Sequence, residues 1–226
     1  VDAASPANIM SSASRAQATP VSIFRILPPW AGLVTSLACG WVPTAVSADV
    51  VPVNYYFAEG ATGAFFDLDL LLGNPNARPA SVELRFLRAD GEVITQELLL
   101  EPWSRRTVVP ENIPGLEAAE FATTVVSVDG LPLLVERSMF WDERRHGGHS
   151  GEAAKALSSL WYFSEGTQLG FDTYLLVANV DDEPVELTFE FLLQDGSPVT
   201  RHYEAAPKSR FTLYAGDVPE LRGRSF

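Results

Sequence analysis

The sequence predicts an all-β protein made of two tandem immunoglobulin-like antiparallel β-sandwich repeats, the second of them truncated. Three observations lead to this prediction. The chain after residue 53 repeats itself, apolar and polar residues alternate there with the period of a β-strand, and 16 Gly and 16 Pro residues suit tight turns between short strands. Long amphipathic helical patterns are not apparent.

Length, net charge and cysteine content limit the number of domains and the classes of partner that the chain can have. A chain of 226 residues has room for two domains of about 100 residues, each with its own core. The formal net charge of −13 argues against nucleic acid or an anionic membrane as a partner, since both would be repelled. Cys39 is the single cysteine, so the chain forms no internal disulfide and no cysteine-based metal site.

Residues 1–53 are predicted to be a signal peptide or disordered N-terminal segment. Met10 is a plausible start, an apolar stretch covers 31–46, and Val46-Ser47-Ala48 has small residues where signal peptidase cleaves. Lipidation of Cys39 and a transmembrane helix are the alternatives, disfavoured by a poor lipoprotein motif and by interrupting prolines. We therefore expect a secreted or cell-surface protein whose mature domain does not insert into a membrane.

An internal repeat defines the rest of the chain. The segment Tyr55–Gly60 (YYFAEG) returns as Trp161–Gly166 (WYFSEG), and the later matches lie 105 residues apart. This predicts repeat 1 over 54–142, a linker over 143–160, and an incomplete repeat 2 over 161–226. The matched polar residues, to which we assign a structural role within the repeat, are Glu59, Asp67, Asn74, Arg105, Glu165, Asp172, Asn179 and Arg210.

Strands are predicted in order along each copy. In the first copy they cover 55–58, 67–73, 82–86, 93–100, 105–109, 121–128 and 133–141, the strand number of an immunoglobulin-like sandwich. In the second copy, strands are expected at 185–189 and 199–205. Asp90-Gly91 and Asp195-Gly196 suit two-residue hairpin turns, because Gly accepts a positive φ.

The second copy stops before its last strands. Phe226 aligns with Phe121, so the counterparts of 123–127 and 133–141 are missing. A sandwich without those strands would expose its core and open edges. We expect the chain to be a fragment of a longer protein, or the incomplete second repeat to pair with another segment or subunit.

Several motifs resemble a known family. The stretches 56–60, 66–67, 71–75, 104–108 and 135–141 (YFAEG, FD, LLGNP, SRRTV and VERSMFW) resemble a repeat found in tandem in large exported proteins of acidobacteria and actinobacteria. The resemblance runs from Tyr55 to the last residue. It implies export and a β-rich module. The function of that family is not known, so the resemblance implies no catalytic residue.

Two carboxylates, Glu59 and Glu165, are the most suggestive candidates for chemistry. A glycosidase needs two carboxyl groups on either side of the scissile bond, and Asp67 or Asp172 could be the second. Because the same residues occur in both copies, a structural role is the better interpretation, for instance a Glu paired with the repeated Arg105 or Arg210. We therefore expect no enzyme and no catalytic residue.

Metal sites are also not expected. His146 and His149, with Asp142, have a spacing that could hold a metal, but the run is Gly-rich and is expected to be a mobile linker. The sequence leaves open whether Asp67, Asp69 and Asn74 bind calcium. Their spacing matches no known calcium-binding loop motif. No cofactor is implied by any motif.

These observations favour a non-catalytic exported module of structural, spacer or adhesion type. The alternative is a carbohydrate-binding module of a secreted or cell-surface protein, in which Trp103, Trp141 and Trp161 stack on sugar rings. The expected partner is a cell-surface protein or a glycan.

Overall fold

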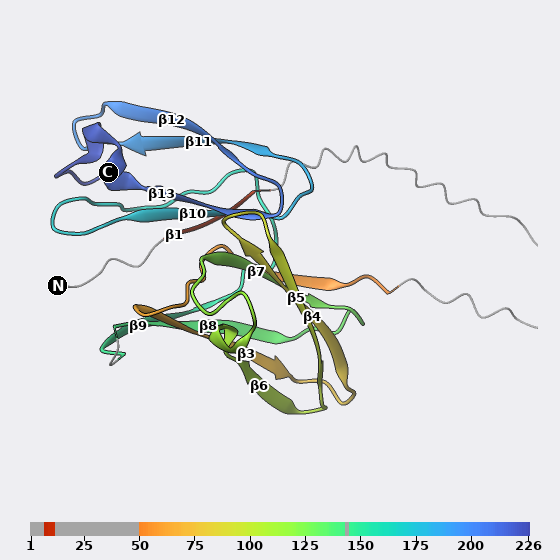
Figure 1. Ribbon diagram of the computed structural model, residues 1–226. Helices are drawn as coiled ribbons and strands as arrows, with labels where there is room; N and C mark the ends of the chain where they lie inside the picture. Colours follow the sequence, from red (N-terminus) through yellow and green to blue (C-terminus); the bar gives the residue numbers. More distant parts are fainter. Residues whose placement is uncertain (1–6, 12–49, 143–144) are drawn as a thin grey trace, which may run out of the picture. The chain divides into compact units, whose positions relative to one another are not determined.

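The computed structural model describes residues 7–11 (as backbone), 50–142 and 145–226 (Figure 1). These ranges belong to one compact unit. Their elements are strands β1 to β13 and three single-turn 3₁₀ helices, η1 to η3, so the prediction of an all-β chain is confirmed. Most of the predicted signal peptide, including Cys39, lies outside the described residues, but Ala7–Ser11 forms strand β1.

The first half of the protein, residues 53–152, has two four-stranded sheets. Their strand orders are β2-β7-β4-β5 and β6-β3-β8-β9, with all pairs antiparallel. The elements are β2 (Val53–Phe57), β3 (Phe66–Asn74), β4 (Ala80–Arg88), β5 (Val93–Leu100), β6 (Ser104–Val108), η1 (Pro110–Asn112), β7 (Phe121–Ser127), β8 (Leu134–Trp141) and β9 (Gly147–Glu152).

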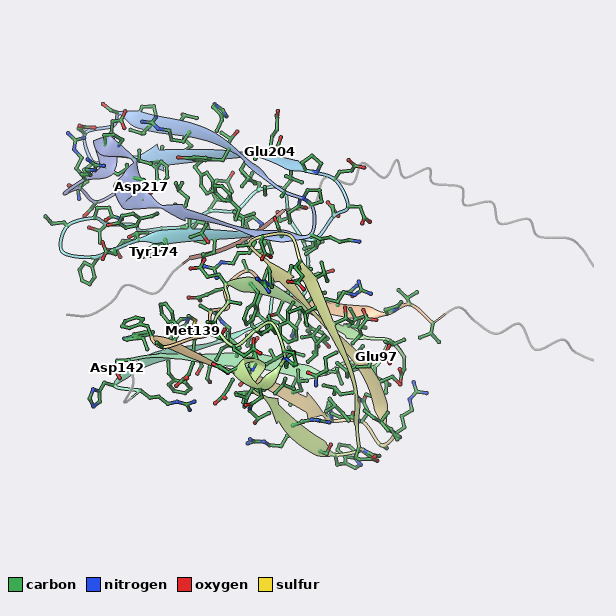
Figure 2. All side chains as sticks on the ribbon, in the orientation of Figure 1. Glu97, Met139, Asp142, Tyr174, Glu204 and Asp217 are labelled. Atoms are coloured by element: carbon green, nitrogen blue, oxygen red, sulfur yellow. The ribbon has the colours of Figure 1, made fainter. Side chains whose placement is uncertain are left out.

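Alternation along the strands builds the core of the first half. In β3 the side chains of Leu68, Leu70 and Leu72 are buried and their neighbours are more exposed, as the period of two requires. Phe57 from one sheet and Leu70 from the other belong to the same core cluster, so both sheets contribute to one apolar interior. Figure 2 shows the side chains crowded between these sheets.

The range predicted to be a linker contains strand β9. It pairs with β8, with Met139 opposite His149. Its glycines allow the strand to approach the aromatic side chains of β8, because a Cβ at Gly147 would lie against the Trp141 indole and one at Gly148 against the Phe140 ring. The prediction of a mobile linker is therefore wrong for 147–152, where Gly147 and Gly148 make room for neighbouring rings.

The second half, residues 161–226, contains fewer strands. They are β10 (Tyr174–Asn179), β11 (Val185–Leu192), β12 (Pro198–Ala205) and β13 (Ser209–Tyr214), followed by η2 (Ala215–Asp217) and η3 (Pro219–Leu221). The sheets have the orders β1-β10-β13 and β11-β12. Strand β1 runs parallel to β10, on the edge that corresponds to the β8 side of β3 in the first half.

The two halves share pairings and side-chain hydrogen bonds 105 residues apart. Leu70 pairs with Val108, and Leu175 pairs with Leu213. The buried Asn74 amide donates to three backbone carbonyls, and Asn179 donates to the carbonyls 105 residues further on. Even the edge-to-face pair of Phe86 with Phe121 returns, as the pair of Phe191 with Phe226.

The halves differ where β2 pairs in the first one. Residues 53–57 form β2 by pairing with β7, whereas 161–164 form no strand. In the described part of the second half, no strand corresponds to β7, so this segment has no ladder partner. As a result Phe163 is 41% exposed while its counterpart Phe57 is 2% exposed.

Candidate functional site

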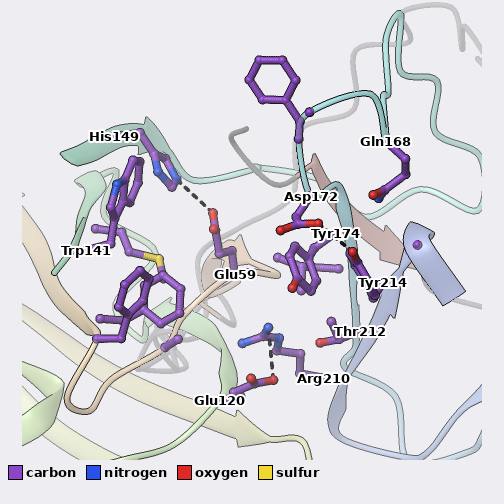
Figure 3. Close-up of a pocket in the computed structure, with 18 of the residues that line it drawn as sticks. Glu59, Glu120, Trp141, His149, Gln168, Asp172, Tyr174, Arg210, Thr212 and Tyr214 are labelled. Atoms are coloured by element: carbon purple, nitrogen blue, oxygen red, sulfur yellow. Dashed lines mark hydrogen bonds and ion pairs between the residues drawn. The ribbon is translucent and has the colours of Figure 1, made fainter. Parts of the chain in front are cut away.

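A pocket of about 690 Å³ lies between residues of the two halves (Figure 3). Aromatic and ionisable side chains dominate its walls. The aromatic ones are Phe65, Phe66, Trp141, Phe171, Tyr174 and Tyr214, and the ionisable ones are Glu59, Glu120, His149, Asp172, Arg210 and Arg222. Such a mixture of rings and convergent polar groups is typical of small-ligand sites.

Glu59 lines this pocket and belongs to a buried ionic cluster. Its carboxylate contacts the Arg137 guanidinium of β8, and the His149 Nε2 of β9 lies 3.0 Å from the carboxylate Oε2. Arg137 Nη1 also donates to the Glu59 carbonyl at 2.7 Å. Burial lowers the pKa of Arg137, and the neighbouring Glu59 charge opposes that effect. The cluster is thus a paired structural group.

Arg210 of β13 joins the two halves on another wall of the pocket. Its Nη1 donates to the Gly60 carbonyl at 2.6 Å, and its Nη2 lies 3.3 Å from Glu120 Oε2. The side chain is 7% exposed, and its burial lowers its pKa, a shift opposed first by Glu120. The counterpart Arg105 is exposed and donates to Thr107 Oγ1 at 3.1 Å.

Two tyrosines of the second half form a stacked pair on the pocket wall. The Tyr174 and Tyr214 rings have centroids 4.9 Å apart and an interplanar angle of 28°. Tyr214 Oη donates to Asp172 Oδ1 at 2.6 Å, and this bond raises the pKa of Tyr214. Desolvation, followed by the Asp172 charge, raises the pKa of Tyr174. Both phenols therefore remain protonated at neutral pH.

The predicted repeat residues fall into different environments. Glu59 and Asp172 both line the pocket, whereas Glu165 is exposed. Glu165 has no counterpart of the Arg137 pair because β8 and β9 have no equivalents in the described second half. Asp67 is paired with Arg145 at 2.8 Å. The suggested pairing of the glutamates with Arg105 or Arg210 is thus not observed; the partners of Glu59 are Arg137 and His149.

Among the tryptophans, Trp141 lines the pocket and its ring centroid is 5.8 Å from that of His149. Trp103 is 73% exposed in a turn with a φ of 56°, away from the pocket lining. Trp161 is half-buried and donates its indole N–H to the Ser158 carbonyl at 3.0 Å. The structure therefore brings one of the three candidate stacking residues to the pocket.

The two stacked tyrosines are not among the residues predicted from the sequence. Tyr174 stands at the repeat position of Asp69, and Tyr214 at that of Val109. The site residues predicted from the sequence were ones that match between the two copies, and these two tyrosines do not match. A residue that differs between the copies can make a contact that its counterpart does not make. That difference in residue type was the signal available in the sequence.

The residues considered for metals do not converge. His146 Nδ1 lies 3.2 Å from Asp142 Oδ2, while His149 turns to Glu59. Asn74 is buried among backbone carbonyls, away from the Asp67 pair with Arg145. Among the described residues, no group of three or more His, Cys, Asp or Glu side chains could hold a metal ion.

The chain has few detectable similarities to known proteins. No family model matches the chain, and no curated protein matches it at a significant level. A solved structure from Thermotoga maritima, described as "Crystal Structure of Thermotoga maritima 1070", covers 47% of this chain and 97% of its own, with 12% identity and a TM-score of 0.42. Within the described ranges, no helix has the length and apolarity needed to cross a membrane.

Proposed function

We propose that this chain is a non-catalytic, exported module of structural or adhesion type, in which two immunoglobulin-like β-sandwich units follow each other in tandem. The observation that carries the proposal is the buried joint between the halves. Ala58, Leu87 and Ala122 of the first half form one apolar cluster with Leu176 and Ala178 of the second. A tandem module with a packed joint keeps its two units in a fixed relation, as a spacer requires.

Polar contacts support the same joint. Arg210 reaches from the second half to the Gly60 carbonyl and to Glu120 of the first. These charge-assisted contacts form only when the halves are together, so they make the closed arrangement specific. Export is supported by the apolar stretch 31–46, which ends in residues typical of a signal-peptidase site. The net charge of −13 would help to keep the exported protein in solution.

The pocket chemistry favours a non-catalytic module. General acid–base hydrolysis needs a carboxylate poised to exchange protons with a substrate. Glu59 is held by Arg137 and His149, Asp172 accepts a hydrogen bond from Tyr214, and Glu120 faces Arg210. Each carboxylate of the pocket is therefore committed to a partner within the protein.

Thermal unfolding of the full chain tests the joint. We expect the unmodified protein to unfold in one cooperative transition, because the halves share buried contacts. Arg210→Ala should either lower the Tm or split the unfolding into two transitions. Arg105→Ala is the matched control, since it removes the same side chain from the equivalent exposed position. Two separate transitions in the unmodified protein would contradict a joint that couples the units.

A carbohydrate-binding function is the second candidate, favoured by the aromatic lining of the pocket. Trp141 and the stacked pair Tyr174 and Tyr214 offer flat apolar faces, and Asp172 and Arg210 supply hydrogen-bonding groups beside them. Glu59 and Glu120 of the pocket lie beside Arg137 and Arg210, so much of the charge is balanced, which suits a neutral sugar better than an ion.

A glycan array followed by calorimetry tests this candidate. We expect Trp141→Ala to weaken the binding of any captured sugar by at least about tenfold, since one stacking platform is lost. Trp103→Ala removes a tryptophan that is 73% exposed outside the pocket and should leave binding unchanged. Equal loss in both variants, or no captured sugar, would rule out this pocket as a sugar site.

A further inference from the structure

The contact between the halves is made by two different faces. The Arg210 face, on β10 and β13, consists of Leu176, Ala178 and Arg210. The Gly60 face, on the first half, consists of Tyr56, Ala58, Gly60, Leu87, Glu120 and Ala122. Because the faces differ, the contact is head to tail, and a head-to-tail contact can in principle be repeated.

A second copy of the Arg210 face lies on the first half and is more exposed than the first copy. The equivalents of Leu176, Ala178 and Arg210 are Leu71 and Gly73 on β3 and Arg105 on β6. Gly73 pairs with Arg105, just as Ala178 pairs with Arg210. Arg105 is exposed, and Leu71 and Gly73 are half-buried, whereas their counterparts are 7%, 2% and 1% exposed.

A second copy of the Gly60 face lies on the second half. Three positions of that face keep their residue type, with Tyr162, Gly166 and Leu192 at the repeat positions of Tyr56, Gly60 and Leu87, whereas Ser164 replaces Ala58. Tyr162 is 85% exposed and Leu192 is 69% exposed, whereas Leu87 is 3% exposed beneath the second half. Two large apolar side chains are thus exposed at positions that take part in the existing contact between the halves.

The backbone acceptor of this second face is also in place. The Gly60 carbonyl accepts hydrogen bonds from both Phe121 N–H and Arg210. The Gly166 carbonyl accepts from Phe226 N–H at 2.8 Å, in the equivalent geometry. Its second lone pair is the natural site for a guanidinium. Ser225 stands where Glu120 is, so the carboxylate partner is missing and the contact is weaker.

We propose that these open faces dock on each other between two copies of this chain, so that copies associate head to tail through Arg105 of one and the Gly166 carbonyl of the next. The inference rests on the proposed equivalence of the two units and is independent of sugar binding. A heterologous contact of this kind leaves one open face of each type at the two ends, so association continues into linear oligomers as concentration rises.

Sedimentation velocity of the full chain at rising concentration and physiological salt tests the proposal. We expect a concentration-dependent rise in sedimentation coefficient. Arg105→Glu should lower the association constant by at least about tenfold, because it places a carboxylate against a carbonyl acceptor. Arg106→Glu is the matched control, since the neighbouring arginine is also exposed but stands at the position of Phe211, which packs on the core of the second half.

A gain-of-contact variant completes the test. Ser225→Glu restores the carboxylate that Glu120 provides in the first contact and should strengthen association, unless Arg105 is also replaced. A protein that stays monomeric at every concentration, or equal association of the Arg105 and Arg106 variants, would overturn the proposal. Thermal unfolding of each variant separates this outcome from loss of the joint between the halves, which would appear as a split transition.

Discussion

At the scale of single residues, the Glu59 cluster shows how burial decides the role of a charged group. Glu59 and Arg137 have side chains 3% and 4% exposed, and His149 covers them. A buried pair of this type contributes little net free energy when intact, yet removal of one partner leaves an uncompensated charge. The cluster therefore fixes the arrangement of β8 and β9 against the segment after β2.

Replacement of one partner should expose this dependence. Arg137→Ala is expected to lower the free energy of unfolding by about 3–5 kcal/mol, because the Glu59 carboxylate stays buried without its cation. Urea unfolding measures the change. Arg145→Ala, which breaks the exposed pair with Asp67, should cost less than about 1 kcal/mol. Similar losses in both variants would contradict the prediction that the buried Glu59 carboxylate depends on Arg137 for charge compensation.

Glu111 supplies a prediction on pH. Burial raises the pKa of this carboxyl above its usual 4.5, although Leu68 N–H donates to its Oε1 at 2.8 Å. A raised pKa means that the folded state binds the proton more tightly than the unfolded one. The contribution to stability is therefore present below the unfolded pKa and is lost as pH rises through the folded pKa.

Glu111→Gln should remove that loss. The variant keeps an acceptor oxygen for Leu68 N–H and carries no charge near Asp67 and Asp69, so we expect a gain of less than about 1 kcal/mol at neutral pH. The gain should vanish at acidic pH. Urea unfolding across the pH range measures it, with the exposed Glu101→Gln as control. A variant less stable at neutral pH would contradict the assignment.

At the scale of elements, β9 shows that a Gly-rich run can be an ordered edge strand. It pairs with β8 over six residue pairs and places His149 beside Glu59. The strand depends on the absence of side chains at Gly147 and Gly148, where Trp141 and Phe140 lie close. Gly151 faces open space instead, so only part of the run is constrained.

This difference within one strand is testable. Gly147→Ala should lower the free energy of unfolding by about 1–3 kcal/mol, because its Cβ would overlap the Trp141 indole. Gly151→Ala meets nothing within 4 Å and should be neutral. Thermal unfolding with tryptophan fluorescence reports both stability and the environment of Trp141. A neutral effect of Gly147→Ala would mean that β9 shifts at little cost.

At the scale of the whole described unit, the apolar cluster between the halves carries the coupling. Leu176 of β10 is 2% exposed in this cluster, whereas Leu192 of β11 is 69% exposed. Both are leucines on strands of the second half. Their contributions should differ because only one of them buries its side chain against the first half.

Leu176→Ala is therefore expected to destabilise the protein by about 2–5 kcal/mol, and Leu192→Ala by less than about 0.5 kcal/mol. Differential scanning calorimetry measures both and also shows whether the transition splits. Equal effects would mean that the cluster between the halves closes over the lost side chain without cost.

The sequence predicted most of the fold because its signals are local. Alternation identified most strands, and matching residues such as Asn74 and Asn179 the shared bonding of the halves. Asp-Gly pairs identified where the hairpins turn, but the turns are longer than the two residues predicted, since Arg88 N–H donates to the Glu92 carbonyl and Leu193 N–H to the Ser197 carbonyl. The sequence predicted fewer of the residues that line the pocket. Trp141 was among the candidates, but Tyr174 and Tyr214 were not, because they differ from their counterparts in the first half.

By itself, the sequence determined the β character, the positions of most strands and the repeat spacing of 105 residues, since alternation and matching residues are properties of the chain alone. Strands β1 and β9 were not predicted. The tertiary structure alone decided which of two identical residues became buried. Arg210 and Arg105 stand at equivalent positions, yet only Arg210 meets another β unit. The physical reason is that burial, pairing and pocket formation depend on what packs against a surface, which no local pattern specifies.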